Sequence, residues 1–254
     1  MKNTRLIGRL DVKGAHLVKG VQFEGLRKLG RPNDFARRYY AEGVDELIYI
    51  DVVASLYQRN GIFDLIEDAT RDIFVPITVG GGLRSVADVE SALRAGADKV
   101  AINTAAVEDP ALISRVAERF GAQCMVLSIE AKRTASGWEA YANYGRDHTG
   151  LDAVAWAVRG HQLGAGEILL TAVDVEGTGR GPDVELIARV AAAVPIPVIA
   201  CGGVATAAHA AGAVRAGADA VAVARALHLG ELALPALRRG AREQGVMVRE
   251  AAAA

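Results

Sequence analysis

ITVGGGL at residues 77–83 and GADKVAINTAA at 96–106 return in the second half of the chain as VIACGGV at 198–204 and GADAVAVARAL at 217–227. Gly81 corresponds to Gly202 (202 − 81 = 121), and Gly96 corresponds to Gly217 (217 − 96 = 121). Self-similarity at a long, fixed period indicates a structure built from equivalent units. We therefore predict one closed fold made of two similar halves, with a single site formed by both.

Short aliphatic runs alternate with helical patterns along the whole chain, which is typical of βα units around a parallel sheet. The runs are almost continuously apolar, as strands buried on both faces are. The predicted strands are Arg5–Asp11, Glu46–Asp51, Pro76–Val79, Lys99–Asn103, Cys124–Glu130, Glu167–Val173, Pro197–Ala200 and Ala220–Val223. Predicted helices between them include Asn33–Glu42, Val86–Ala95, Pro110–Phe120, Leu151–Leu163 and Val184–Val194.

Eight such units predict an α/β fold, a (βα)8 TIM barrel with a half-barrel internal repeat. The alternative is an open doubly wound sheet, which the repeat and the strand number disfavour. We expect one barrel domain over residues 1–254, with half-barrels at approximately 1–122 and 123–254. Two connections are long, 13–32 and 131–150, and the second has the pattern of a small hairpin; loops of this length are usually functional.

Composition and residue spacing argue against several classes of partner and ligand. A formal net charge of −1 without a basic stripe argues against nucleic acid or an anionic membrane as a partner. No apolar run has the length of a membrane span, and the two cysteines lack metal spacing. The five histidines also lack such spacing, and we interpret them as surface or loop residues. We predict a cytoplasmic protein without a metal or a cofactor; the histidines are His16, His148, His161, His209 and His228.

Two carboxylates end equivalent strands, Asp11 the first and Glu130 the fifth (130 − 11 = 119). TIM-barrel enzymes carry their chemistry at these carboxyl ends of the strands. Two carboxyl groups across a barrel mouth can serve one substrate as general acid and general base. Solvation of strand ends is the alternative explanation, and the pairing through the repeat favours catalysis. The sequence does not assign the acid and the base.

The glycine pairs predict phosphate binding. Gly81-Gly82 and Gly202-Gly203 allow backbone N–H groups to approach an anion closely, and the next helix N-terminus favours negative charge. The strands that follow each pair end in Asn103-Thr104 and Ala224-Arg225, which extend each binding loop. Two such sites predict a ligand with a phosphate at each end, whereas simple turn glycines would not explain a fixed offset.

The chain resembles the cyclase subunit of imidazole glycerol phosphate synthase (the HisF family) along nearly its full length. The resemblance rests on LDVKG (10–14), LVKGVQFEGLR (17–27), DELIYIDVVAS (45–55), TVGGGLRS (78–85), GADKVAINTAAVEDP (96–110), YGRDHTGLDAVAWA (144–157) and GAGEILLTAVDVEGTGRG (164–181). It implies a lyase of histidine biosynthesis that acts on a bisphosphorylated ribulosyl aminoimidazole carboxamide ribonucleotide. With ammonia, that reaction gives imidazole glycerol phosphate and aminoimidazole carboxamide ribotide.

The resemblance also implies a partner, a glutaminase (HisH-like) docked on the N-terminal face of the barrel. Arg5, Glu46, Lys99 and Glu167 begin strands where the family has a charged gate for ammonia. From chemistry alone, the same four residues could form a neutral salt-bridge plug. Lys19 matches the lysine of the family's mobile loop, which closes over the substrate.

Four positions at the mouth depart from the family pattern. Glu130 and Glu176, the latter before Gly177 in the substrate-binding loop, replace aspartates, and Cys201 and Arg225 replace serines at the phosphate site. These changes keep an alternative open: a HisF-like partner of a glutaminase that serves an amidotransferase in surface sugar biosynthesis. The related barrel isomerase of the same pathway and a non-catalytic activator of a glutaminase are further alternatives.

Overall fold

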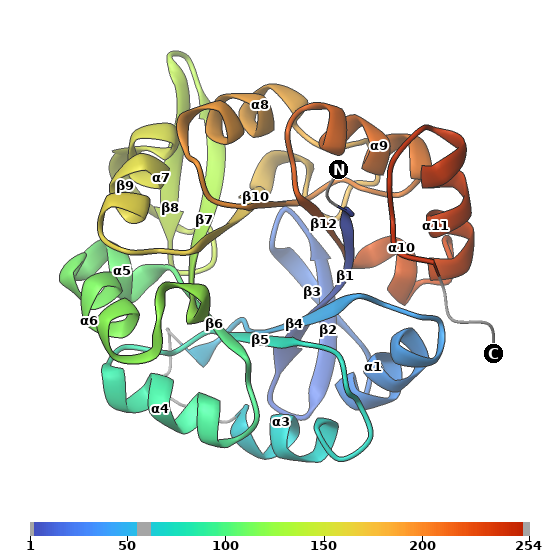
Figure 1. Ribbon diagram of the computed structural model, residues 1–254, viewed down its shortest axis with the longest axis horizontal. Coiled ribbons are helices and arrows are strands. Elements are labelled where there is room, and N and C mark those ends of the chain that lie inside the picture. Colours follow the sequence, from blue (N-terminus) through green and yellow to red (C-terminus); the bar gives the residue numbers. More distant parts are fainter. Residues whose placement is uncertain (1–2, 55–61, 251–254) are drawn as a thin grey trace.

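The computed structural model describes residues 3–54 and 62–250. Within them, eight parallel strands close into a barrel, because each pairs with the next and the last pairs with the first (Figure 1). The barrel strands are β1 (Arg5–Lys13), β4 (Glu46–Asp51), β5 (Ile77–Gly80), β6 (Lys99–Ile102), β7 (Met125–Thr134), β10 (Glu167–Ala172), β11 (Val198–Cys201) and β12 (Ala220–Val223). The predicted TIM barrel is confirmed.

Helices surround the barrel as the alternating pattern predicts. The described helices are α1 (Pro32–Ala41), α3 (Phe63–Ala69), α4 (Val86–Arg94), α5 (Thr104–Glu108), α6 (Ala111–Phe120), α7 (Ala153–Gln162), α8 (Val184–Ala193), α9 (Ala207–Arg215), α10 (Arg225–His228) and α11 (Leu234–Glu243). Side-chain caps mark several starts; for example, Ser85 accepts a hydrogen bond from the Asp88 N–H at the start of α4. None of the helices in these described parts has the length and apolarity needed to cross a membrane.

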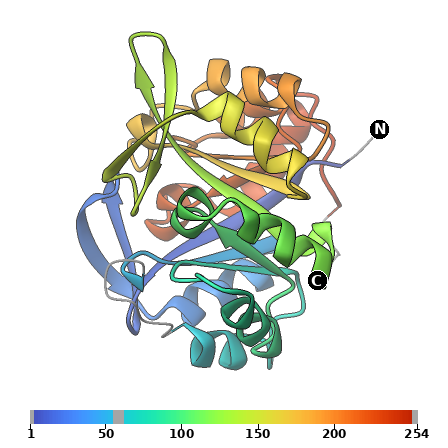
Figure 2. The ribbon, with the colours of Figure 1, turned by 90° about the vertical axis from the view of Figure 1, so that its left-hand side faces the viewer.

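Two hairpins project from one end of the barrel (Figure 2). The connection after β7 forms the expected hairpin, with β8 (Gly137–Ala142) and β9 (Asp147–Asp152). The connection after β1, expected to be a loop, contains a second antiparallel hairpin of β2 (His16–Val21) and β3 (Glu24–Gly30). The sequence missed it because the β2–β3 turn departs from the usual glycine patterns: Gln22 and Phe23 both have positive φ, 53° and 67°.

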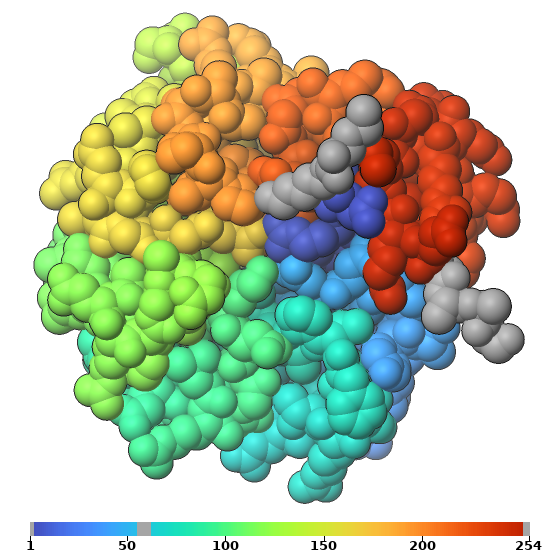
Figure 3. All heavy atoms as spheres, in the orientation of Figure 1, coloured from blue at the N-terminus to red at the C-terminus, as the bar shows by residue number. Residues whose placement is uncertain are grey.

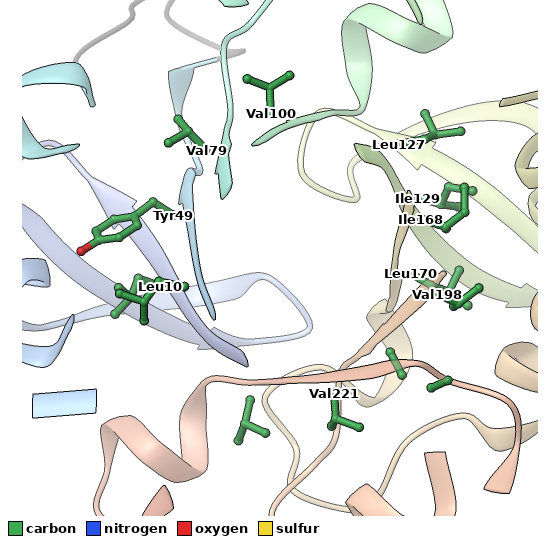
Figure 4. Packing of buried hydrophobic residues seen from close by; sticks show 14 of the residues in the cluster. Leu10, Tyr49, Val79, Val100, Leu127, Ile129, Ile168, Leu170, Val198 and Val221 are labelled. Atoms are coloured by element: carbon green, nitrogen blue, oxygen red, sulfur yellow. The ribbon is translucent and has the colours of Figure 1, made fainter. Parts of the chain in front are cut away.

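Successive side chains of each barrel strand point alternately outward and inward, which creates two separate apolar cores. Outward side chains of the strands pack against the helices, as Leu10, Val79 and Leu127 do in Figure 4. Inward side chains such as Ile7 and Leu169 form a second cluster inside the barrel. Because a strand has a period of two, the inward positions of β1 are residues 5, 7, 9 and 11, which run from the floor of the barrel to its mouth.

One histidine differs from the sequence interpretation. His228 is buried in α10, with 6% of its surface exposed, and its Nδ1 lies 2.6 Å from the Tyr39 hydroxyl. Burial lowers the pKa of His228 to about 3, so its imidazole is neutral at physiological pH. It therefore belongs to the packing between α1 and α10, not to a surface loop.

Candidate active site at the barrel mouth

Asp11 is completely buried at the top of the inward row of β1. One of its carboxylate oxygens accepts a hydrogen bond from Arg9 Nε (2.9 Å), and the other accepts one from Lys19 Nζ (2.9 Å). Burial alone would raise the pKa of Asp11, but the positive charges of Arg9 and Lys19 outweigh it and hold this pKa well below its ordinary value. Asp11 is therefore a permanent anion.

Glu130, on β7, has the opposite protonation behaviour. Its carboxyl is buried, with 6% exposed, and its Oε2 accepts a hydrogen bond from the Gly145 N–H at 2.8 Å. Burial raises the pKa of Glu130 to about 7, because the charge of Arg9 and the Gly145 N–H offset the loss of hydration only in part. At neutral pH this group can hold or release a proton.

The two hairpins meet over the carboxylates. The Phe23 ring from the β2–β3 turn stacks on Tyr144 from the β8–β9 turn, with ring centroids 3.9 Å apart. Lys19 of β2 is buried between Asp11 and Glu176 and pairs with both. Tyr144 places its hydroxyl 3.4 Å from Asp11. The structure thus brings Lys19 and Glu176 together at the mouth. The two hairpins cover Asp11 there.

The first glycine pair borders a cavity of about 190 Å³. Gly81 and Gly82 have positive φ, and a Cβ on Gly81 would lie 2.2 Å from the Asp51 carbonyl oxygen, so only glycine fits there. Asn103, Thr104 and Glu130 line the same cavity. The sequence suggested that the helix after the glycine pair, α4, would point its N-terminus at the cavity. The helix whose first residues line the cavity is instead the short α5.

The second glycine pair borders a much smaller cavity of about 10 Å³. Around it lie the remaining predicted site residues: Glu176, Gly177, Gly202, Gly203, Ala224 and Arg225. Arg225 pairs with Glu231 at 2.6 Å, which holds its guanidinium near the cavity. Cys201 also lines this cavity. The two cavities therefore belong to equivalent strands of the barrel, and neither Asp11 nor Lys19 is among the described residues that line them.

At the opposite end, four charged side chains form a closed ring on the floor of the barrel. Arg5 Nη1 lies 2.8 Å from Glu46, and its Nη2 bonds Glu167. Lys99 Nζ lies 3.2 Å from Glu46 and 2.9 Å from Glu167. Each cation bridges both carboxylates, so the predicted cluster is present. Figure 3 views this face, on which the chain start, in dark blue, lies near the centre.

Sequence reasoning missed Arg9, Arg84 and Tyr144. Arg84 lines the larger cavity next to the glycine pair, and its basic side chain suits an anion there. The signal for Arg9 was available: it lies two residues before Asp11 and therefore on the same face of the strand. Tyr144 gave no signal, because its place depends on how the second hairpin folds back over the barrel.

Comparison with known proteins relates the chain to a single family. The family model described as "Histidine biosynthesis protein" matches residues 5–233. A Legionella pneumophila protein is 60% identical over 80% of this chain and 96% of its own length. Relatives from Myxococcus xanthus and Mycobacteroides abscessus are 51% and 49% identical, each over at least 97% of both chains. All three bear the name "Imidazole glycerol phosphate synthase subunit HisF".

Proposed function

Because the chain belongs to the histidine biosynthesis protein family and is a cyclase subunit of imidazole glycerol phosphate synthase, we propose that its mouth residues bind a doubly phosphorylated ligand and catalyse its ring closure with ammonia. The substrate is the bisphosphorylated ribulosyl aminoimidazole carboxamide ribonucleotide. The products are imidazole glycerol phosphate and aminoimidazole carboxamide ribotide. One observation carries the proposal: the barrel mouth holds two buried carboxyl groups of opposite protonation, and one of them, Glu130, lines a cavity that is bordered by a glycine pair.

The two cavities would each receive one phosphate. Backbone N–H groups of Gly81-Gly82 and Gly202-Gly203 are suited to phosphate oxygens, with Arg84 and Arg225 supplying positive charge. In the ligand-free protein the second cavity is nearly closed, so the ligand must displace side chains there. Glu176 Oε2 is buried and has no hydrogen-bond partner in the described structure, which suits a sugar hydroxyl of the ligand.

The carboxyl groups would divide the proton transfers. Condensing ammonia with the ribulosyl carbonyl forms a C–N bond and releases the carbonyl oxygen as water, which requires a proton donor and a proton acceptor. Glu130, with its pKa raised to about 7, is suited to donate the proton. Asp11 stays ionised and is suited to stabilise a cationic intermediate, whereas Glu130, once it has donated its proton, can accept one from nitrogen.

Ammonia would come from a glutaminase on the floor side of the barrel. In support, the floor ring of Arg5, Glu46, Lys99 and Glu167 is partly accessible, with about a fifth of the Arg5 and Lys99 side chains exposed. The ring pairs all its charges internally, so opening it requires breaking specific ion pairs. We therefore assign to the ring the role of a gate through which ammonia enters.

Turnover of the bisphosphorylated ribonucleotide with ammonium salt, without a glutaminase, tests the proposal. We expect imidazole glycerol phosphate from the unmodified protein and a loss of at least about a hundredfold in Asp11→Asn and Glu130→Gln. The exposed Glu118→Gln is the matched control and should keep full activity. An inactive but folded unmodified protein would overturn the proposal. Nothing in the comparisons favours the sugar-biosynthesis alternative.

A further inference from the structure

We propose that Arg9 is a positioning residue for this reaction: it holds the Asp11 carboxylate in place and ionised from inside the barrel, through hydrogen bonds to other barrel strands rather than to the hairpin that carries Lys19. The inference rests on the proposed function for its kinetic consequences. Its geometric basis does not depend on that function. It assigns a role to a buried arginine that neither the repeat nor the glycine pairs point to.

Arg9 is anchored on three sides. Only 2% of its surface is exposed. Its Nε donates to Asp11 Oδ1 at 2.9 Å, and its Nη1 lies 2.9 Å from Thr171 Oγ1 on β10 and 3.4 Å from Cys201 Sγ on β11. The guanidinium therefore spans the barrel interior from β1 to the strands of the other half. A planar group fixed at both ends gives its carboxylate partner a defined orientation.

The other partners of Asp11 come from the hairpins. Lys19 belongs to β2, and Tyr144 lies in the turn between β8 and β9. Since Asp11 is fully buried beneath them, a ligand reaches it only if at least one of them moves. Arg9 lies on the same strand as Asp11 and is hydrogen-bonded to barrel strands, whereas its contact with the first hairpin is the stacking of its guanidinium over the Phe23 ring, 5.6 Å from the centroid. Once Lys19 turns to a substrate phosphate, Arg9 is the cation that remains on Asp11.

The charge environment supports the same conclusion. Besides Arg9 and Lys19, the ionisable groups facing Asp11 are Tyr144, Glu130, Glu176 and the neutral His228. Arg9 lowers the pKa values of both Asp11 and Glu130. Its removal therefore raises both pKa values, and it moves the acidic and the alkaline limbs of the pH–rate profile in the same direction, toward higher pH.

The test uses Arg9→Met, which removes the charge, and Thr171→Val, which removes an anchor but keeps the charge. Ammonium-driven kcat and KM are measured across pH, together with the carboxyl ¹³C signals of the ligand-free proteins. For Arg9→Met we expect kcat to fall on the order of a hundredfold, with both limbs displaced upward by about one pH unit or more. Thr171→Val should lower kcat and leave the limbs in place. Arg9→Lys should restore the limbs.

A matched control is Arg238→Met, because Arg238 is also a buried arginine (3% exposed) paired with a carboxylate, Asp45, but lies outside the barrel. It should lower stability without moving either limb. An Arg9→Met protein with unshifted Asp11 and Glu130 titrations, or with kcat reduced equally at every pH, overturns the inference. The ¹³C titrations need no turnover, so an inactive unmodified protein would count against the proposed function alone. If Arg9→Met does not fold, Thr171→Val and Arg9→Lys decide the outcome.

Discussion

Asp11 and Glu130 are carboxyl groups of equal burial whose surroundings shift their pKa values in opposite directions. Asp11 lies between two cations, Arg9 and Lys19, whereas Glu130 has neutral N–H donors, from Gly145 and Asn103, and the more distant charge of Arg9. Desolvation therefore dominates at Glu130 and ion pairing dominates at Asp11. Near neutral pH, Glu130 can therefore give and take a proton, while Asp11 supplies a fixed negative charge.

The same difference has a thermodynamic consequence for Glu130. Its pKa in the folded protein is about 7, against an ordinary value of 4.5, so its favourable contribution to stability is full below pH 4.5 and is lost as the pH rises through 7. Glu130→Gln should therefore become more stable than the unmodified protein at pH 8, by up to about 3 kcal/mol. Urea unfolding at pH 5 and pH 8 measures the change; an equal difference at both pH values contradicts it.

Asp11→Asn should have the opposite effect. Its folded-state pKa is lowered, so the stability that it contributes is present above its ordinary pKa of 3.8 and is lost only in more acidic solution. The substitution leaves Arg9 buried without its carboxylate partner and Lys19 with Glu176 alone, which costs about 3–5 kcal/mol. We expect this loss to be similar at pH 5 and pH 8 in the same unfolding experiment. A substitution without effect on the free energy of unfolding would mean that water stabilises the two cations in place of the Asp11 carboxylate.

The charged residues of strand β1 show which site residues the sequence predicts and which it does not. In RLIGRLD (5–11) the carboxylate was predicted because it ends the strand, whereas Arg9 was missed although it shares the face of Asp11, because the strand alone does not reveal its other partners. Its partners Thr171 and Cys201 lie more than 160 residues away. Only closure of the barrel brings them together.

At the scale of elements, the β2–β3 hairpin depends on one close backbone approach. A Cβ on Gly177 would lie 2.3 Å from the Gly20 carbonyl oxygen, which is backbone and cannot rotate away. Gly177→Ala should therefore push the hairpin off the mouth, separate Lys19 from Glu176 and raise the substrate KM by about tenfold or more. Limited proteolysis within 14–30 should accelerate in parallel.

Gly230→Ala is the matched control for this prediction. Gly230 has the same φ of +70° as Gly177, but a Cβ there would meet open space. The substitution introduces comparable backbone strain without contact to the hairpin, so KM and the proteolysis rate should stay unchanged. Equal effects of both substitutions would show that strain, not the approach to Gly20, is responsible.

The elements themselves were predictable, and their ends were less so. All eight barrel strands were found from continuous apolar runs, yet β7 continues to Thr134, past the predicted end at Glu130. Its extension pairs with β8, and hydrogen bonds to a later hairpin strand leave no mark on the hydrophobic pattern. The first hairpin was expected to be a loop for a separate reason, because its turn at Gln22 and Phe23 lacks the usual glycine pattern.

On the scale of the whole molecule, the floor ring and the mouth are separate sites at opposite ends of the barrel. Lys99→Met removes a cation from the ring without touching Asp11 or Glu130, and it leaves the two ring carboxylates sharing only Arg5. We expect ammonium-driven turnover to stay within about twofold of normal and glutamine-driven turnover with a glutaminase partner to fall about tenfold or more. Loss of both activities together would contradict the separation.

The repeat predicted the global architecture from sequence alone, because equal offsets place equivalent residues on equivalent strands; anion binding at the two glycine pairs stays a prediction. It did not predict that one cavity is open and the other nearly closed. That asymmetry comes from side chains that differ between the halves, such as Asn103 against Ala224 and Thr104 against Arg225. The division into half-barrels near residue 122 stays a prediction.

The inward row of β1 joins both ends of the barrel on a single strand: Arg5, Ile7, Arg9 and Asp11 alternate with Leu6, Leu10 and Val12, which face the helices. Mutational tolerance along this segment should accordingly oscillate with a period of two. Leu6, Leu10 and Val12 should accept other aliphatic residues, while Arg5, Arg9 and Asp11 accept few. Deleting residue 8 would move either Arg5 or Arg9 and Asp11 onto the wrong face of the strand, so a single change in β1 should affect the proposed gate or the proposed chemistry.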